Sequence, residues 1–276
     1  MVKKKIIICS TIKNEEKNLG RFFKKINSLL SIFEEHYLIF VLSDTYDKSE
    51  NLLNDYLKGK RGTVIVKNFD NQTNRIEKLE ICRNEYLNFI RKNNEIKDYD
   101  YLLVMDADGV NNILNEKVLA ETIQKEKWNA IFANQKFFYY DIFALRIDKL
   151  INENFILKIK KDFQNNVYEQ PKRIIFNNLT RFFFINKLFK ERYIEVNSAF
   201  GGLGIYKLNI ILEFNYHSNS GKNCEHVKLN EDINKKYGGM FIDKLLFNSY
   251  GLNIHSINGL ISAVSNIFAK RFINKI

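Results

Sequence analysis

The sequence predicts an α/β fold in which helices cover both faces of a mostly parallel central sheet. Short apolar runs alternate five times with amphipathic segments between residues 5 and 134, which is the pattern of parallel sheets. Hydrophobic residues make up 45% of the 276 residues, enough to bury a substantial core. One proline and 12 glycines exclude a chain dominated by linkers or collagen-like repeats.

The expected strands are short and dominated by Ile, Val and Leu, as in strands buried on both faces of a sheet. They span residues 5–9, 37–42, 63–67, 100–105 and 129–134. The helices between them place apolar residues three and four positions apart, which gives each helix one apolar face. They span residues 15–33, 51–57, 76–91 and 115–127.

We expect a single domain over residues 1–276. The alternating pattern fills residues 1–147, and residues 148–196 are predicted to form a basic, irregular or helical insertion. Residues 197–276 complete the domain, and the segment 257–276 has the apolar periodicity of a helix with basic residues toward its end. Such a helix either packs on the core or lies on an anionic bilayer.

The chain is basic, with 43 Lys and Arg against 32 Asp and Glu and a net charge of +11. This charge fits a phosphorylated substrate, an anionic membrane surface or nucleic acid. It fits the amino-acid usage of an AT-rich genome equally well. Because no recognised nucleic-acid-binding module is present, we expect no nucleic-acid partner.

No apolar stretch is long enough for a signal sequence or a membrane span. Cys9, Cys82 and Cys224 lack the paired spacing of a disulfide framework or a zinc–cysteine site, which favours a reducing compartment. We therefore expect a cytoplasmic protein whose contact with the inner face of a membrane, if it has one, is peripheral.

Polar side chains follow the predicted strands, where open α/β sheets bind their ligands. The candidate binding residues near these strand ends are Asn14, Glu15, Asp44, Asp47, Arg83, Asp106 and Asp108. Asp44 is expected to bond a base or ribose, while Asp47 either does the same or caps the next helix. Arg83 either reaches a phosphate group or lies on a solvated helix face.

The run Asp106-Ala107-Asp108-Gly109 follows the apolar strand 100–105. Two carboxylates separated by one residue can face a single hard cation, and Mg²⁺ or Mn²⁺ prefers carboxylate oxygens and shares them with phosphates. A cation there would neutralise a diphosphate. The same triplet occurs in ordinary Asp-rich turns, so its position in the alternating series is what favours a metal site.

Together these motifs resemble those of glycosyltransferases with the GT-A fold. The resemblance rests on Asn14-Glu15, Ser43-Asp44-Thr45 with Asp47, Arg83-Asn84 and Asp106-Ala107-Asp108. Blocks at residues 139–146, 198–206 and 224–227 are similar to a bacterial branch related to the fungal capsule-associated α-1,3-mannosyltransferases. Phe143 stands where that branch is expected to have Trp, which keeps an aromatic wall in place.

The resemblance implies transfer of a sugar from a GDP- or UDP-sugar donor to a hydroxyl of a glycan or lipid-linked acceptor in surface polysaccharide synthesis. It implies Mn²⁺ or Mg²⁺ as cofactor, with Asp108 binding the metal directly and Asp106 near the ribose or the metal. Residues 1–147 would be the nucleotide-sugar-binding half, and residues 197–276 the acceptor side. The donor sugar and the stereochemistry stay open because both vary among similar folds.

The Cys224-Glu225-His226 run unites three reactive side chains. Glu225 is a candidate general base if configuration is inverted, or it stabilises positive charge on the sugar if configuration is retained. His226 is a candidate third metal ligand, with His255 as its rival. The alternative is an exposed turn in which His226 only packs.

Two further sets of candidates precede this run in the sequence. Asp141 either bonds sugar hydroxyls or pairs with Arg146. Gly201 and Gly202 are expected to let a sugar ring lie close to the backbone.

Two other functions are alternatives to glycosyl transfer. A sugar nucleotidyltransferase needs a Gly-rich basic loop after its first strand, and residues 10–14 contain no glycine. A basic nucleic-acid-binding protein is supported by charge alone.

Overall fold

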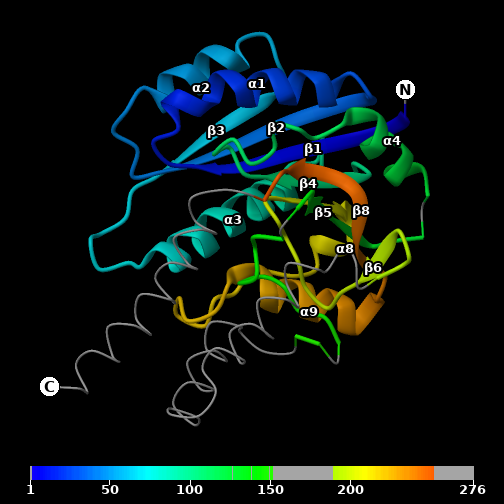
Figure 1. Cartoon of the computed structure of the whole chain (residues 1–276). Coiled ribbons are helices and arrows are strands. Elements are labelled where there is room, and N and C mark those ends of the chain that lie inside the picture. The colour runs from blue at the N-terminus through cyan, green and yellow to red at the C-terminus, as the bar shows by residue number, and fades with distance from the viewer. Residues whose placement is uncertain (1, 126, 138, 149, 152–188, 252–276) are drawn as a thin grey trace, which may run out of the picture.

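One mixed sheet organises the computed structural model (Figure 1), which describes residues 2–125, 127–137, 139–148, 150–151 and 189–251. Its strand order is β3-β2-β1-β4-β7-β5-β8-β6. The first four strands of this order are parallel neighbours. They are β1 (Val2–Ile12), β2 (Phe33–Ser43), β3 (Gly62–Lys67) and β4 (Tyr101–Met105). The predicted parallel series is therefore confirmed for the first half of the chain.

The remaining strands come partly from the second half of the chain. β7 (Leu203–Lys207) runs antiparallel between β4 and β5 (Ala130–Gln135). β8 (Met240–Ser249) is parallel to β5, and β6 (Tyr193–Glu195) runs antiparallel to β8 at the sheet edge. The sequence did not predict β6, β7 or β8 individually. β6 also lies inside the segment predicted as an insertion.

Helices cover both faces of the sheet, as the sequence predicts (Figure 1). One face carries α1 (Glu16–Leu30), α2 (Ser49–Leu57) and α4 (Glu116–Gln124). The other carries α3 (Arg75–Lys92), the short α8 (Leu208–Ile211) and α9 (Glu225–Tyr237). The first helix ends at Leu30, not at residue 33, because the chain from Phe33 onward pairs with β1.

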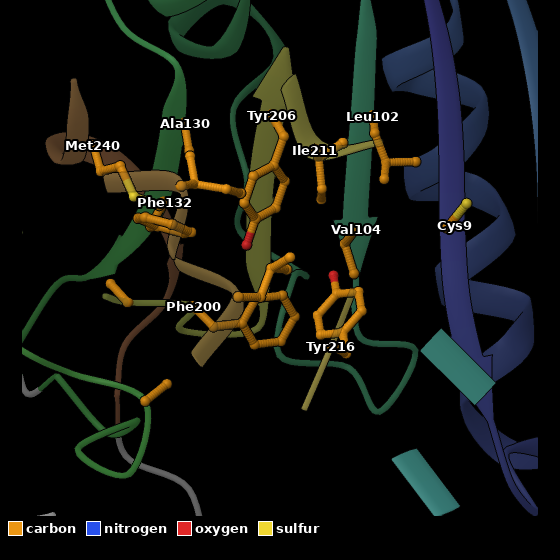
Figure 2. Close-up of a cluster of buried hydrophobic side chains, with 14 of the residues drawn as sticks. Cys9, Leu102, Val104, Ala130, Phe132, Phe200, Tyr206, Ile211, Tyr216 and Met240 are labelled. Carbon is orange, nitrogen blue, oxygen red and sulfur yellow. The ribbon is translucent and has the colours of Figure 1, made fainter. Parts of the chain in front are cut away.

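The core between the sheet and α3, α8 and α9 is rich in aromatic rings (Figure 2). Phe132 of β5 meets Tyr206 of β7 edge to face, with ring centroids 5.7 Å apart. The buried hydroxyl of Tyr206 donates to Asn230 Oδ1 of α9 at 3.0 Å, and that of Tyr86 on α3 donates to the Tyr216 hydroxyl at 2.8 Å. These contacts fix the two helices that carry the buried charged residues of the site.

Several predictions fall outside the described residues. They are most of the insertion at 148–196, the helix at 257–276 and His255. Within the part of the chain that is described, no helix has both the length and the apolar character needed to cross a membrane.

Candidate active site

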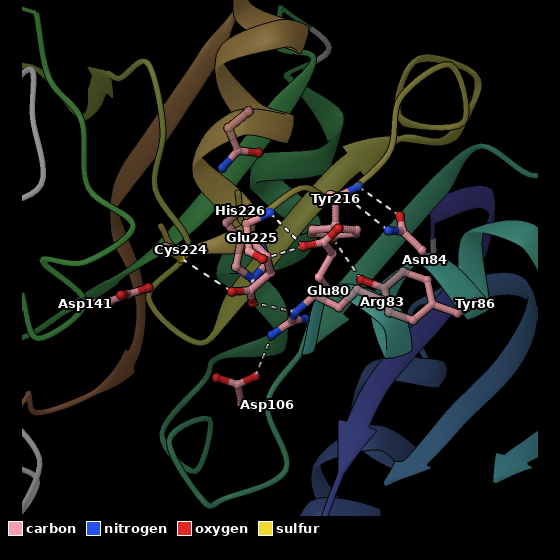
Figure 3. Close-up of polar contacts among 12 residues, drawn as sticks. Glu80, Arg83, Asn84, Tyr86, Asp106, Asp141, Tyr216, Cys224, Glu225 and His226 are labelled. Carbon is pink, nitrogen blue, oxygen red and sulfur yellow. Dashed lines mark hydrogen bonds and ion pairs between the residues drawn. The ribbon is translucent and has the colours of Figure 1, made fainter. Parts of the chain in front are cut away.

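Charged side chains from three distant segments meet at the carboxyl end of β4 (Figure 3). Arg83 on α3 donates from Nε to Glu225 Oε1 at 2.9 Å, and its Nη2 lies 3.6 Å from Asp106 Oδ1. The side chains of Arg83 and Glu225 are 4% and 5% exposed, whereas that of Asp106 is 29% exposed. Arg83 therefore joins the end of β4 to the start of α9. The prediction that it lies on a solvated helix face is wrong.

Aromatic rings hold the Arg83 guanidinium in place. Its Cζ lies 5.0 Å from the ring centroid of Phe200 and 5.8 Å from that of Tyr216, distances at which a cation is attracted to a ring. Its Nη1 is buried and has no hydrogen-bond partner among the described residues. Buried donors are nearly always satisfied, so this nitrogen is suited to an anionic ligand oxygen or a water.

Asp106 lies in an acidic environment. Burial raises its pKa to about 7; Arg83 opposes this shift, and Asp108, Asp141 and Glu225 add to it. Asp108 is exposed, and its Oδ1 accepts from the backbone N–H of Val110 at 3.1 Å. Several carboxylates thus surround one guanidinium, and Asp106 and Asp108 present oxygens of the kind that Mg²⁺ and Mn²⁺ prefer. The donor set fits a hard divalent cation.

The raised pKa of Asp106 predicts a pH-dependent stability for the metal-free chain. Between 3.8 and about 7 the folded state holds a proton that the unfolded state releases, so the free energy of unfolding falls as the pH rises through this range. Burial lowers the pKa of His226, which acts in the opposite direction. Comparison with Asp106→Asn isolates the carboxyl. Urea unfolding at about pH 5 and about pH 8 should show a smaller fall for the variant; an equal fall would contradict the prediction.

His226 lies in the protein core beside Glu225, with its Nε2 3.7 Å from Glu225 Oε1. Among the described residues, no group of three His, Cys, Asp or Glu side chains could hold a metal ion. The His226 ring is buried and stacks on Phe200, with centroids 3.8 Å apart and planes at 19°. Both ring nitrogens of His226 are buried and have no hydrogen-bond partner among the described residues, and a metal-binding role for His226 stays a prediction. The alternative exposed turn is wrong, since residue 226 lies in the buried first turn of α9.

Gly201 and Gly202 form a tight turn before β7, with φ angles of 63° and 82°. A Cβ on Gly202 would lie 2.5 Å from Val110 Cγ1 and 2.7 Å from the Tyr140 hydroxyl. Protein atoms thus fill the space on the Cβ side of the turn, and the approach of a sugar ring to its backbone stays a prediction. The Gly202 carbonyl accepts from the backbone N–H of Asp106 at 2.9 Å. The turn therefore positions the metal-binding candidate.

Asp141 lies on the other side of this turn. Its carboxylate accepts from the backbone N–H groups of Gly201 at 3.0 Å and Ala144 at 3.3 Å. These backbone contacts, not the alternative pairing with Arg146, hold the side chain. Burial raises the pKa of Asp141, and the nearby Glu225 acts in the same direction. Its place in the carboxylate cluster keeps it available for ligand hydroxyls.

The loop after β2 is bound to neighbouring loops. Asp44 accepts from Lys78 Nζ at 2.7 Å and from the backbone N–H of Phe69 at 2.8 Å, and these bonds lower its pKa. Asp47 accepts from the backbone N–H groups of Ser49 and Glu16 at 2.9 and 3.0 Å. Asp47 thus bonds the first backbone N–H of both α1 and α2, although the N-cap residue of α2 is Lys48. Asp44 is satisfied within the protein.

Asn14 and Glu15 connect the ends of β1 and β2. Asn14 has a positive φ of 54°, and its Oδ1 accepts from the Tyr46 backbone N–H at 3.0 Å. The Glu15 carboxylate accepts from Asn18 Nδ2 at 2.7 Å. Partial burial raises the pKa of Glu15, and the charge of Asp108 adds to this shift. Glu15 and Asp108 thus lie near one another, as expected for neighbouring strand ends.

Three buried amides that the sequence analysis did not select support the glycine turn. Asn248 donates to the Gly201 carbonyl at 2.7 Å and to Asn111 Oδ1 at 3.0 Å. Gln135 donates to the same carbonyl at 3.1 Å. A buried amide has the local appearance of a loop residue, so sequence alone gives no signal for these contacts.

No protein-family model matches the sequence, and no curated protein is similar to it. The structure is similar to that of the mannosyltransferase PcManGT from Pyrobaculum calidifontis, solved in complex with GDP-Man and Mn²⁺. The TM-score is 0.53 at 10% identity, over 99% of this chain and 65% of that chain. This likeness shows the GT-A fold. The chain spans less than two thirds of the length of this mannosyltransferase.

Two other solved structures have lower similarity. Glucosyl-3-phosphoglycerate synthase from M. tuberculosis has a TM-score of 0.46 at 13% identity, over 94% of this chain and 80% of that chain. TarS from S. aureus has a TM-score of 0.44 at 10% identity, over 86% of this chain and 57% of that chain.

Proposed function

We propose that the chain is a glycosyltransferase that moves a sugar from a nucleoside diphosphate sugar to a hydroxyl group. The observation that carries this proposal is the gathering of Asp108, Asp141, Glu225 and Arg83 around Asp106 at the carboxyl end of β4 in a GT-A sheet. Open α/β sheets bind their ligands at this edge. The structurally similar mannosyltransferase binds GDP-Man and Mn²⁺, which supports a donor of this chemical class.

Asp106 and Asp108 would hold the Mn²⁺ or Mg²⁺ ion, since both lie at the strand end and offer carboxylate oxygens. Such an ion neutralises charge on the diphosphate as the sugar is transferred. The buried Nη1 of Arg83 has no hydrogen-bond partner among the described residues and would donate to an oxygen of the same diphosphate. Arg83 would thus compensate both the phosphate charge and the charge of Asp106.

Glu225 and Asp141 are proposed to face the sugar. The Arg83–Glu225 ion pair at 2.9 Å holds the Glu225 side chain at the carboxyl end of β4, where it would stabilise positive charge on the sugar. Asp141 has oxygen lone pairs beyond its two backbone bonds and would accept from sugar hydroxyls. The acceptor proposed is a glycan or lipid-linked hydroxyl, as in surface polysaccharide synthesis.

Calorimetric titration with nucleoside diphosphates and their sugars tests this function. We expect one nucleotide to bind only when Mn²⁺ or Mg²⁺ is present, and Asp108→Asn to weaken that binding by more than about tenfold, since even indirect partners of metal ligands contribute that much. Asp98→Asn is the matched control, because Asp98 is exposed and precedes the amino end of β4. Slow release of nucleoside diphosphate from the donor, with water as acceptor, should show the same dependence.

Two results would contradict the proposal. One is equal nucleotide binding by Asp108→Asn and the unaltered chain. The other is preferential binding of nucleoside triphosphates with release of pyrophosphate from a sugar phosphate, which would favour a nucleotidyltransferase instead.

A further inference from the structure

A basic cavity of about 330 Å³ lies along α1, separate from the carboxylate cluster. It is lined by Arg21, Lys24, Lys25 and Ser28 of α1 and by Asn112 from the loop before α4. The four α1 residues are spaced three and four apart, so they share one face of the helix. The volume is at the lower end of small-ligand sites.

The cations of this cavity differ in how they are neutralised. Lys25 Nζ donates to the Leu114 carbonyl at 2.6 Å and pairs with Glu116 Oε1 at 3.0 Å. Arg21 and Lys24 are exposed, and neither has an ion pair or side-chain hydrogen bond with any described residue. Like charges three and four residues apart on a helix repel each other. An anion between them would relieve this repulsion.

The cavity is adjacent to the candidate active site but not part of it. Asp108 and Asn112 belong to one turn, since Val110 N–H donates to Asp108 Oδ1 at 3.1 Å and Asn112 N–H to the Gly109 carbonyl at 3.3 Å. Glu16 begins α1 at the carboxyl end of β1. With a rise of 1.5 Å per residue, Arg21 and Ser28 lie about 8 and about 18 Å farther along the helix. An anion held there is distinct from a diphosphate at the strand ends.

We propose that this cavity binds a phosphate group other than the one bound at the carboxylate cluster. Arg21 and Lys24 supply charged donors that are unpaired among the described residues, and the Asn112 amide adds a neutral one; phosphate oxygens accept from all three. The Ser28 hydroxyl already donates to Glu116 Oε1 and to the Lys25 carbonyl, so it lines the cavity without adding a donor. The phosphate belongs either to a soluble phosphorylated saccharide or to a phospholipid headgroup. Both sources present the same oxygens to the same cations. The proposal does not depend on the proposed glycosyl transfer.

The test is the variant Arg21→Gln/Lys24→Gln in the full chain. Both positions are exposed and glutamine is a good helix former, so the fold should be retained. Titration with inorganic phosphate and with glycerol 3-phosphate, followed by NMR, should show binding at least about tenfold weaker than to the unaltered chain. Lys97→Gln/Lys235→Gln removes two exposed charges elsewhere and should bind phosphate normally.

Sedimentation with phosphatidylglycerol vesicles and with phosphatidylcholine vesicles distinguishes the two sources. Vesicle binding that the Arg21/Lys24 variant loses and the control variant keeps assigns the phosphate to a lipid headgroup; binding of the soluble phosphates alone assigns it to a saccharide. Unchanged phosphate binding in the variant, or no binding of any of these probes by the unaltered chain, would overturn the proposal.

Metal-dependent nucleoside diphosphate binding is measured on the same proteins. It should be equal in the variant and the unaltered chain, and its absence from both would count against the proposed function without touching the phosphate site. If the variant loses nucleotide and phosphate together, the cavity is part of the donor site and the separate phosphate site is wrong.

Discussion

Replacement of Arg83 by methionine is expected to lower the free energy of unfolding by about 3–5 kcal/mol, because removal of one partner leaves a buried charge uncompensated. The Glu225 carboxylate is 5% exposed and loses its 2.9 Å bond from Arg83 Nε. Asp106 loses the nearest positive charge. In the unaltered chain this charge opposes the rise in the pKa of Asp106. Methionine keeps much of the side-chain volume, so lost charge and not a cavity causes the effect. Urea unfolding at neutral pH measures it.

The control for this variant lies on the same helix. Arg75 is the exposed first residue of α3, and Arg75→Met should change stability by less than about 0.5 kcal/mol. The loss in Arg83→Met should also shrink as the pH is lowered, because the pKa of Asp106 is raised and protonation of this carboxyl removes one uncompensated charge. A loss below about 1 kcal/mol, or one that is equal at acidic and neutral pH, would show that Arg83 does not compensate these carboxylates.

The first half of the fold is predictable because its signals are local. The apolar run at residues 5–9 and the periodic face of α1 are short-range patterns, and both elements are present. β8 is different, since its Asp243 resembles a loop residue. In the structure Asp243 is buried and accepts two bonds from Arg192, both at 2.9 Å. A buried charge is tolerated in a strand only with such a partner, and a partner 51 residues away cannot be identified from local pattern.

The candidate site likewise combines residues that local sequence predicts with contacts that it does not predict. Asp106 and Asp108 follow an apolar strand, and this local context placed them correctly at the sheet edge. The contact of Arg83 with Glu225 joins residues 142 positions apart, so the sequence indicated each side chain but not the ion pair. The role predicted for His226 rests on its residue type and on the family resemblance. The stacking of His226 on Phe200 depends on how α9 packs against the turn before β7, which no sequence spacing encodes.

Gly202→Ala is the second substitution with a large expected effect, because it combines backbone strain with overpacking. The φ of 82° costs a residue with a Cβ about 1–2 kcal/mol. The new Cβ would lie 2.5 Å from Val110 Cγ1, and such overpacking adds about 1–3 kcal/mol. Displacement of the turn also moves the carbonyl that accepts from Asp106 N–H. We therefore expect a loss of about 2–5 kcal/mol, measured by urea unfolding, together with weaker metal-dependent nucleotide binding.

Gly59→Ala separates the two contributions. Gly59 has a similar φ of 73°, but a Cβ there would meet no atom within 4 Å, so this variant carries the backbone cost alone. The difference between the variants is then the steric cost at Gly202. Combination with Val110→Ala should recover part of that cost, and the double-mutant cycle should give a favourable coupling energy. If Gly59→Ala and Gly202→Ala lower the free energy of unfolding equally, Val110 moves aside without an energetic cost. The close packing of the turn would then not be what holds Asp106 in place.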